Sequence, residues 1–409
     1  MDFYSKYMYW LENDYFDEDT KKELLSIKDN KKEIEDRFYK ELEFGTAGLR
    51  GIIGAGTNRM NKYIIRKVSQ GLADYINKKG NIFAKRGIVI AYDSRFKSQE
   101  FALEASLVFA ANGITTWFFD EIKPVSFLSF AIRYLNAAAG VAITASHNPK
   151  EYNGYKVYWE EGSQILDDIA KEILDNINSI KDFSEIKIMD FEEGLNKGLI
   201  SYIGKDIDDE YVEYVKSLSL NDNIDKDIKI VYTPLNGTGN KLVRRVLRER
   251  GFANVFVVPE QENPDPDFKT VGYPNPEDIK AFEYAKRLGK EKNADILIAT
   301  DPDCDRVACM VKDDEGNYRE INGNQIGALL VNYILSSRHE KGTIPQNAAI
   351  VKSIVTGDLS KAIADKYNVK TVETLTGFKH ICGKANEFDK TKENTFLFGY
   401  EESIGYVYG

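Results

Sequence analysis

The sequence has few cysteines, and its three, Cys304, Cys309 and Cys382, show no C-x-x-C spacing. This pattern argues against a disulfide framework and favours reduced thiols in a cytosol. Nowhere do about eighteen apolar residues follow one another, so no membrane-spanning helix is predicted. The first residues, MDFYSKYMYWLENDYFDEDTKKELL, are acidic, helical in pattern and lack the apolar core of a signal peptide. We therefore expect a soluble, cytoplasmic protein.

Basic residues are outnumbered by acidic ones, and the formal net charge is −10. This balance argues against nucleic acid or an anionic membrane as a general partner. The 409 residues are too many for one hydrophobic core and enough for two to four domains. A hydrophobic fraction of 43% is ordinary for a globular protein.

Three similar strand–loop–helix–strand units begin near residues 88, 228 and 348. The first contains a helix predicted from about Gln99 to Asn112. Repetition at this long spacing predicts three α/β domains in series rather than a solenoid. Linker-like composition near residues 195–211 and 313–325 places the boundaries. We expect an N-terminal helical extension (1–40) that packs on domain 1 (41–205), then domain 2 (206–318) and domain 3 (319–409).

A serine and a histidine stand side by side at the end of an apolar strand, in TASHNPKEYNGYK, residues 144–156. Ser146 could simply cap the following element while Pro149 turns the chain. A hydrolase is disfavoured because there is no G-x-S-x-G elbow, and adjacent residues cannot easily adopt triad geometry. A serine that accepts a phosphoryl group is the third possibility, with His147, Asn148 and Lys156 as its polar neighbours.

Three aspartates follow another apolar strand, in ATDPDCDR. Asp301, Asp303 and Asp305 alternate, so an extended loop would point their carboxylates one way, as a hard divalent cation requires. An EF-hand is rejected because Arg306 and Lys312 occupy positions where it needs glycine and glutamate. A phosphatase with an aspartyl nucleophile is possible but fits less well. A partly filled Mg²⁺ shell with room for a phosphate oxygen fits best.

Three further motifs carry polar groups that could bind a ligand. FGTAGLRGIIGAGTN lacks both the P-loop and the dinucleotide pattern, and taken alone it is most simply a flexible cluster of turns. It also holds Arg50 between two glycines, and a guanidinium suits phosphate oxygens. TLTGFKHI offers Lys379 and His380, which could equally well begin a helix. FGYEESIGY places Glu401 and Ser403 after an apolar strand, where they could be solvated surface or could bind sugar hydroxyls.

In order and spacing, these motifs resemble the α-D-phosphohexomutases, and specifically the phosphoglucomutase/phosphomannomutase family. The motifs are GTAGLRG (45–51), TASHNPKEYNGYK (144–156), DPDCDR (301–306), TGFKH (376–380) and GYEESIG (399–405). The resemblance covers nearly the whole chain from about residue 41. It implies consecutive α/β domains with mixed sheets sandwiched by helices, and an active site in the cleft between the domains.

The resemblance also implies residue roles. Ser146 corresponds to the phosphoserine, which also contributes an oxygen to the metal site, and Asp301, Asp303 and Asp305 correspond to the Mg²⁺ ligands. Arg50 and Arg306 correspond to active-site cations, and His147 and Lys156 to the candidates for proton transfer. The implied ligands of the sugar are Thr376, Gly377, Lys379, His380, Glu401 and Ser403.

The implied activity is that of a phosphosugar mutase, an isomerase of carbohydrate metabolism that interconverts hexose 1-phosphate and hexose 6-phosphate. The hexose would be α-D-glucose, with glucose 1,6-bisphosphate as intermediate and activator and Mg²⁺ as cofactor. The family's fourth domain, with its RxSGTEP-like loop, has no counterpart in the sequence, so we expect a fragment with little or no activity, as a monomer or a homodimer. Phosphopentomutase, hexose-bisphosphate synthase and a non-catalytic phosphosugar-binding protein remain the alternatives.

Overall fold

The computed structural model describes residues 2–45 and 48–409, which divide into two compact units. The first unit consists of Met1–Ile122, Leu128–Ala145 and Pro149–Ile203. The second consists of Lys123–Phe127, Ser146–Asn148 and Gly204–Gly409. The short segment around Ser146 is thus grouped with the C-terminal half of the chain, although the strands on either side of it belong to the N-terminal half.

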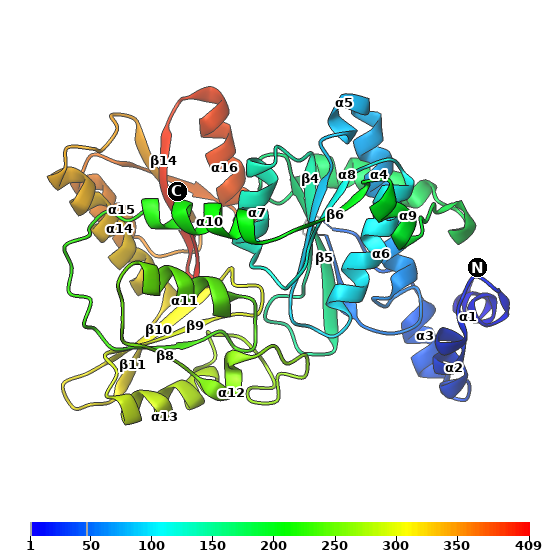
Figure 1. Ribbon diagram of the computed structural model, residues 1–409, viewed down its shortest axis with the longest axis horizontal. Helices are drawn as coiled ribbons and strands as arrows, with labels where there is room; N and C mark the ends of the chain where they lie inside the picture. The colour runs from blue at the N-terminus through cyan, green and yellow to red at the C-terminus, as the bar shows by residue number, and fades with distance from the viewer. Residues whose placement is uncertain (1, 46–47) are drawn as a thin grey trace. The chain divides into compact units, whose positions relative to one another are not determined.

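A six-stranded mixed sheet forms the centre of the first unit (Figure 1). The strand order is β1-β5-β4-β2-β3-β6, in which β4, β2, β3 and β6 are parallel and β5 is antiparallel to both of its neighbours. Its strands are β1 (Leu49–Ile52), β2 (Ile88–Tyr92), β3 (Thr116–Phe119), β4 (Ala139–Ile143), β5 (Tyr152–Trp159) and β6 (Ile200–Ile203).

Helices cover both faces of this sheet, which explains why β2 and β4 are apolar throughout and fully buried. Figure 1 shows α7 (Val125–Tyr134) on one side of the sheet and α4, α6 and α8 on the other. The remaining bounds are α4 (Lys62–Lys78), α5 (Asn81–Ala84), α6 (Ser98–Ala111), α8 (Asp167–Ser179), η1 (Phe183–Glu185) and α9 (Phe191–Asn196). The helix predicted over 99–112 is therefore α6.

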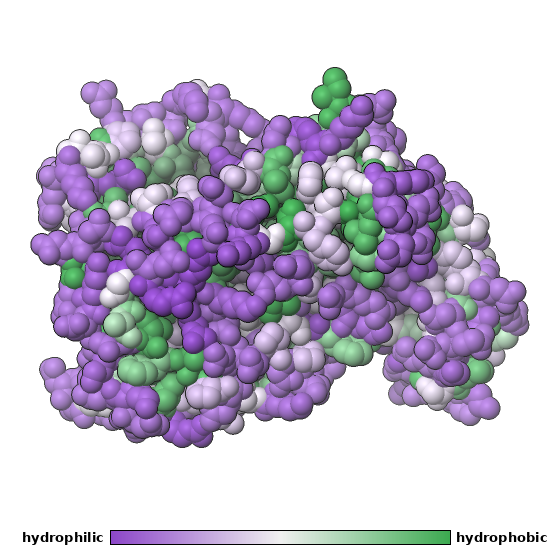
Figure 2. Space-filling model, viewed as in Figure 1, coloured by the Kyte–Doolittle hydropathy of each residue, from purple (hydrophilic) through white to green (hydrophobic). Residues whose placement is uncertain are grey.

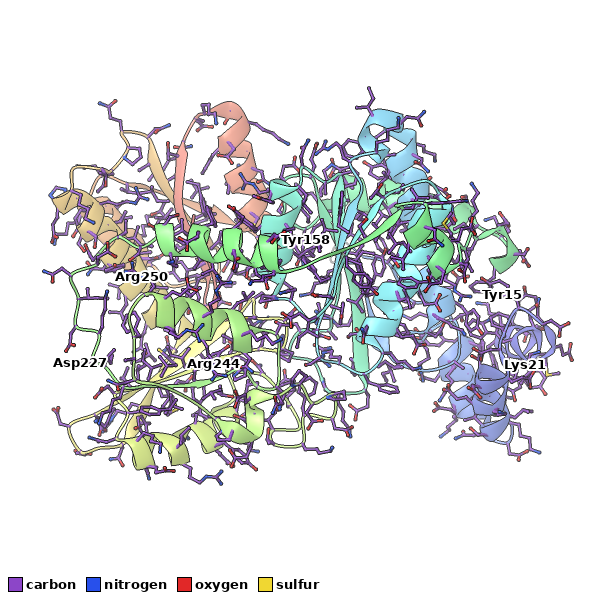
Figure 3. All side chains as sticks on the ribbon, in the orientation of Figure 1. Tyr15, Lys21, Tyr158, Asp227, Arg244 and Arg250 are labelled. Atoms are coloured by element: carbon purple, nitrogen blue, oxygen red, sulfur yellow. The ribbon has the colours of Figure 1, made fainter. Side chains whose placement is uncertain are left out.

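The N-terminal 40 residues form three short helices, α1 (Phe3–Glu12), α2 (Glu18–Ser26) and α3 (Lys31–Phe38). Their aromatic side chains form a cluster with residues of the following domain. Trp10 stacks on Phe16 at 4.2 Å between ring centroids and meets Tyr63 of α4 edge-on at 5.5 Å. Tyr15, labelled in Figure 3, stacks on Phe183 at 5.7 Å. These contacts attach the helices to the first unit.

The second unit contains two smaller mixed sheets, with strand orders β11-β10-β9-β7-β8 and β13-β12-β14-β15. The first holds β7 (Ile230–Thr233), β8 (Val255–Val257), β9 (Ile296–Thr300), β10 (Val307–Lys312) and β11 (Tyr318–Ile321). The other holds β12 (Ala348–Ser353), β13 (Lys370–Thr374), β14 (Thr395–Glu401) and β15 (Gly405–Val407). The predicted repeat is visible here, because β2, β7 and β12 each begin one α/β unit.

Most helices of the second unit pack on these two sheets, and α10 packs on α11. They are α10 (Lys205–Ser217), α11 (Gly239–Glu249), α12 (Pro259–Glu262), η2 (Ile279–Phe282), α13 (Glu283–Lys292), α14 (Gly323–Glu340), α15 (Leu359–Lys366) and α16 (Phe378–Thr391). The predicted fold class, mixed sheets sandwiched by helices, is confirmed. Among the described residues, no helix is both long and apolar enough to cross a membrane.

Most residues in the face shown in Figure 2 are hydrophilic, and hydrophobic ones gather in patches. In the second unit, four large apolar side chains follow the carboxyl ends of β12 and β13. Leu375 is 66% exposed and Leu359 64%, and Ile354 and Val355 are exposed to a similar extent. The predicted sugar-binding motif at 376–380 therefore begins beside an exposed apolar edge.

Candidate active site

Ser146 adopts a left-handed backbone conformation, with φ of 52°. Only 3% of the residue is exposed, and its Oγ donates a hydrogen bond to Asp301 Oδ2 at 2.7 Å. The Nδ1 atom of His147 lies 3.1 Å from the same Oγ. A left-handed serine is uncommon and marks a backbone whose surroundings hold it in place. The hydroxyl is thus aimed at the aspartate cluster more than 150 residues downstream.

The three aspartates lie in a tight turn, not in the extended loop that the alternation predicted. Cys304 has φ of 57°, and its N–H donates to the carbonyl of Asp301 at 3.0 Å. The backbone N–H groups of Asp305 and Arg306 donate to Asp301 Oδ1, each at 3.1 Å. The carboxylates converge because the turn wraps around the Asp301 side chain, so the prediction of extended geometry was wrong although the grouping was right.

Carboxylate oxygens of Asp301, Asp303 and Asp305 all lie within 4.8 Å of one another. Burial, together with the charges of Asp303 and Asp305, raises the pKa of Asp301 well above its usual value. Three carboxylates packed so closely repel one another unless a cation neutralises them. Oxygen donors of this kind are the ligands that Mg²⁺ and Ca²⁺ take, so the donor set fits a hard divalent cation.

The turn that carries the three aspartates is connected to the predicted sugar loop by main-chain contacts. Arg306 forms an isolated antiparallel bridge with Gly405, and the Val307 N–H donates to the Ile404 carbonyl at 3.0 Å. The Arg306 guanidinium lies 3.3 Å from Glu277. Ile404 also packs in the core of the second unit's five-stranded sheet. The turn at 301–306 and the loop at 401–405 are therefore held together by main-chain contacts and by the packing of Ile404.

Glu401 ends β14 and is buried, with an exposed fraction of 8%. Its carboxylate accepts a hydrogen bond from the backbone N–H of Gly377, which precedes α16. Burial raises the pKa of Glu401. The structure thus brings two predicted sugar-binding motifs together. Thr376 is exposed, Lys379 and His380 lie in the first turn of α16, and Ser403 lies in the turn after β14.

Glu402, which the sequence did not single out, anchors this loop. Its Oε2 accepts hydrogen bonds from Ser353 Oγ at 3.1 Å and Thr356 Oγ1 at 2.8 Å. The Glu402 N–H donates to Thr356 Oγ1 at 3.1 Å. Lys352, which is 1% exposed, donates to the Thr356 carbonyl at 2.8 Å. No sequence signal marked this network, because Glu402 lies about 50 residues along the chain from Ser353 and Thr356.

Arg50 and Lys156 lie in the first unit, on adjacent antiparallel strands. Arg50 is exposed and pairs in register with Gly154 of β5, and Lys156 stands two residues further along β5. Since alternate residues of a strand share a face, both side chains lie on the same face of the sheet. Thr46 and Ala47 of the same predicted motif lie outside the described residues.

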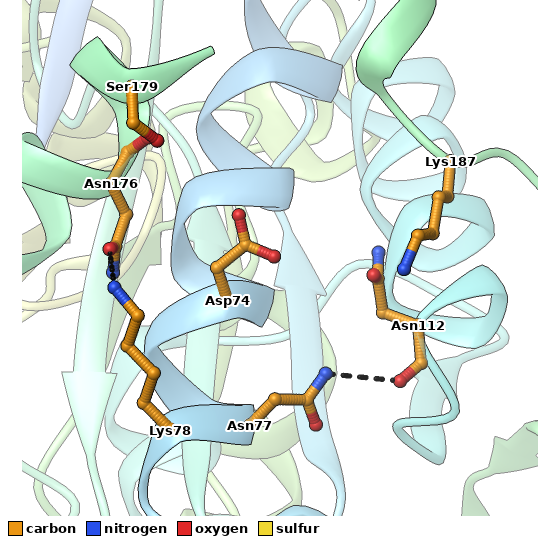
Figure 4. Close-up of a pocket in the computed structure, with 7 residues that line it drawn as sticks. All are labelled: Asp74, Asn77, Lys78, Asn112, Asn176, Ser179 and Lys187. Carbon is orange, nitrogen blue, oxygen red and sulfur yellow. Dashed lines mark hydrogen bonds between the residues drawn. The ribbon is translucent and has the colours of Figure 1, made fainter.

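A polar pocket of about 560 Å³ lies elsewhere in the first unit, where α4, α6 and α8 end (Figure 4). Its lining residues are Asp74, Asn77, Lys78, Asn112, Asn176, Ser179 and Lys187. Lys78 donates to the Asn176 side chain, and Asn77 donates to the Asn112 carbonyl at 3.2 Å. Lys78, in the last turn of α4, also offsets the negative end of the helix dipole, which gives it a structural role.

Three family models match the chain in sequence order. They describe the α/β/α domains I, II and III of phosphoglucomutase/phosphomannomutase, and they match residues 41–183, 209–316 and 322–409. All the motifs described above fall within these ranges.

Two bacterial proteins and one solved structure illustrate the likeness. A phosphoglucomutase of Staphylococcus haemolyticus is 39% identical over 91% of this chain, and one of Staphylococcus saprophyticus is 40% identical over 90%. The chain spans about two thirds of their length, 66% and 65%. The crystal structure of a candidate phosphomannomutase from Thermus thermophilus superposes with a TM-score of 0.72. It is 26% identical, and the match covers 90% of this chain and 76% of that one.

Proposed function

Because this chain belongs to the phosphoglucomutase/phosphomannomutase family, we propose that it interconverts hexose 1-phosphate and hexose 6-phosphate through a phosphoserine at Ser146. The hexose is α-D-glucose, as the names of the staphylococcal relatives suggest. The observation that carries the proposal is the 2.7 Å hydrogen bond from Ser146 Oγ to Asp301 within a cluster of three carboxylates.

The reaction is two phosphoryl transfers in opposite directions. In the first, the bond between phosphorus and Ser146 Oγ breaks and a bond to the free sugar hydroxyl forms, while that hydroxyl gives its proton to a base. The product is a hexose 1,6-bisphosphate. In the second, the other phosphoryl group returns to Ser146 Oγ and a proton returns to the sugar oxygen. No phosphoryl group is lost, so a hexose monophosphate leaves and the phosphoserine is regenerated.

Asp301, Asp303 and Asp305 would hold Mg²⁺, and their pure oxygen donor set fits this ion. When bound, Mg²⁺ supplies charge neutralisation for the phosphoryl oxygens. From their positions in the family motifs, Arg306 and Arg50 are assigned the role of further cations in the active site. His147, whose Nδ1 lies 3.1 Å from Ser146 Oγ, and Lys156 are the candidates for moving the hydroxyl proton.

Binding of the sugar is assigned to the loop joined by Glu401 and Gly377. Glu401 and Ser403 would accept and donate hydrogen bonds to sugar hydroxyls, with Thr376, Lys379 and His380 beside them. A buried carboxylate that already accepts one backbone hydrogen bond is well oriented for this task, since its remaining lone pairs point in fixed directions.

The proposal can be tested by the half-reaction, which needs no complete turnover. The chain is incubated with Mg²⁺ and glucose 1,6-bisphosphate carrying labelled phosphate. We expect labelled protein and an equal amount of glucose monophosphate.

Ser146→Ala should abolish both products, whereas Ser26→Ala, at an exposed helix end, should leave them unchanged. Release of inorganic phosphate without labelled protein would contradict the proposal and favour a phosphatase.

A further inference from the structure

A buried ion pair lies directly after β2, at Asp93 and Arg95. The Arg95 Nε lies 3.4 Å from Asp93 Oδ2, and their side chains are 0% and 1% exposed. Asp93 Oδ1 also accepts hydrogen bonds from Ser98 Oγ at 2.6 Å and from the Arg95 N–H at 3.0 Å. Burying two charges is costly unless their hydrogen bonds are satisfied. The other hydrogen bonds of Asp93 and Arg95 therefore indicate which part of the structure the pair stabilises.

Those partners flank Ser146 on both sides in the chain. Arg95 Nη1 donates to the carbonyls of Pro149 at 2.9 Å and Tyr152 at 3.2 Å. On the other side, the Asp93 N–H donates to the carbonyl of Ile143, three residues before Ser146, at 3.2 Å. Asp93 and Arg95 thus contact the chain on both sides of Ser146, at Ile143 before it and at Pro149 and Tyr152 after it.

The segment around Ser146 contains a backbone conformation that its surroundings must stabilise. Ser146 has φ of 52°, and a non-glycine residue keeps this conformation only where its surroundings over-determine it. The strand behind the segment is equally constrained, because a side chain at Gly154 would meet the Thr144 carbonyl at 2.4 Å. Arginine suits the task, since its guanidinium directs Nη1 to the two carbonyls while Nε faces Asp93, whereas a lysine offers a single point charge.

We propose that Asp93 and Arg95 are positioning residues, which hold the segment Thr144–Tyr152 so that the Ser146 hydroxyl is presented for phosphoryl transfer. The inference deepens the proposed function and rests on it for its chemical consequence. The two residues act through their contacts with Ile143, Pro149 and Tyr152. A displacement of about 1 Å at a reacting atom can cost about 100-fold in rate, so a small relaxation of this segment is enough to slow the transfer.

The test compares Arg95→Lys with the matched control Arg66→Lys. Arg66 also forms a shielded ion pair in the first unit, with Glu104 at 2.6 Å, and both side chains are largely buried. The two readouts are the rate at which Ser146 takes up a phosphoryl group from glucose 1,6-bisphosphate and amide hydrogen exchange over residues 144–152. Thermal unfolding of each variant measures its general destabilisation.

We expect Arg95→Lys to lower the maximal rate of phosphoryl uptake by about 100-fold, with little change in the half-saturating bisphosphate concentration. Exchange should accelerate within 144–152 alone. Arg66→Lys should change neither. The inference is overturned if Arg95→Lys keeps the wild-type rate and wild-type exchange, or if both variants slow only in proportion to their lost thermal stability.

Two safeguards keep the outcomes distinct. If the wild-type chain takes up no phosphoryl group, the proposed function fails, and hydrogen exchange alone then decides whether the pair holds the segment. If Arg95→Lys does not fold, Ser98→Ala replaces it, since it removes one hydrogen bond to Asp93 and the one that Asn153 Nδ2 donates to Ser98 Oγ, and leaves Arg95 in place. Its control is Ser106→Ala, on the same helix, whose hydroxyl bonds only the Leu103 carbonyl among the hydrogen bonds described. The results expected for this pair of variants, and those that would contradict the inference, are the ones given above for Arg95→Lys and Arg66→Lys.

Discussion

At the scale of single residues, the site combines a left-handed serine with a crowded carboxylate cluster. Ser146 donates its hydrogen bond to Asp301, whose pKa is raised by burial and by the neighbouring Asp303 and Asp305. Either a proton on Asp301 or a metal cation at the cluster can therefore neutralise the excess negative charge of the three carboxylates. The two must compete, because a metal ligand has to be deprotonated.

This competition predicts a pH-dependent metal affinity. A raised pKa means that Asp301 keeps its proton to higher pH, so Mg²⁺ should bind more weakly as the pH falls and should release a proton when it binds. Calorimetric titration in buffers of different ionisation enthalpy measures both effects. Asp303→Asn should weaken binding at every pH, and the same change at the exposed Asp314 should not. A Mg²⁺ affinity that does not change with pH would contradict this account.

Much of the site was predictable at this scale, because strand ends and residue types are local properties. Ser146 and Asp301 were identifiable since each follows an apolar strand. The convergence of the aspartates was predicted for the wrong reason, since the turn at Cys304 is not visible in an alternating pattern. Arg95 and Glu402 were missed because their partners lie about 50 residues away, and a single sequence carries no signal for such pairs.

At the scale of elements, β1, β5 and β4 pack too closely to admit a side chain at Gly154. A Cβ there would lie 2.4 Å from the Thr144 carbonyl and 2.9 Å from that of Leu49. Gly154→Ala should therefore lower the free energy of unfolding by roughly 1–3 kcal/mol, measured by denaturant titration. Gly45→Ala is the control, since its nearest neighbour would be 4.0 Å away. Equal effects at both positions would show that the strands relax at little cost.

The loop after β14 depends on a hydroxyl from another element. Thr356 is 3% exposed and bonds both the Glu402 carboxylate and its N–H. Thr356→Val should cost roughly 1–3 kcal/mol because it leaves polar groups unsatisfied, and it should accelerate amide exchange over residues 399–405. Thr356→Ser keeps the hydroxyl and should preserve slow exchange there. If the serine variant exchanges as fast as the valine variant, the hydroxyl does not anchor the loop.

At the scale of the whole molecule, the N-terminal helices are part of the first unit's packing. Trp10 is 1% exposed and contacts Phe16, Phe38 and Tyr63. Trp10→Ala should lower the free energy of unfolding by about 3–5 kcal/mol. Tyr4→Ala, at a 53% exposed position, should change it by about 0.5 kcal/mol or less. Both are measured by denaturant unfolding, and a small loss for Trp10→Ala would mean that these helices unfold separately.

The repeated α/β plan was the part of the molecule most open to prediction, because the starts of β2, β7 and β12 are marked by apolar runs. The division into two units was not predictable. It groups Ser146–Asn148 with the C-terminal half of the chain, which also holds the hydrogen-bond partner of Ser146, Asp301.

The central claim, that Ser146 carries the phosphoryl group, is tested most directly by mass spectrometry of the protein itself. Intact mass and peptide mapping are compared before and after incubation with Mg²⁺ and glucose 1,6-bisphosphate. We predict a mass increase of one phosphoryl group, localised to the peptide that contains Ser146 and absent in Ser146→Ala. An unmodified Ser146 after incubation, or a phosphoryl group on another residue, would contradict the account.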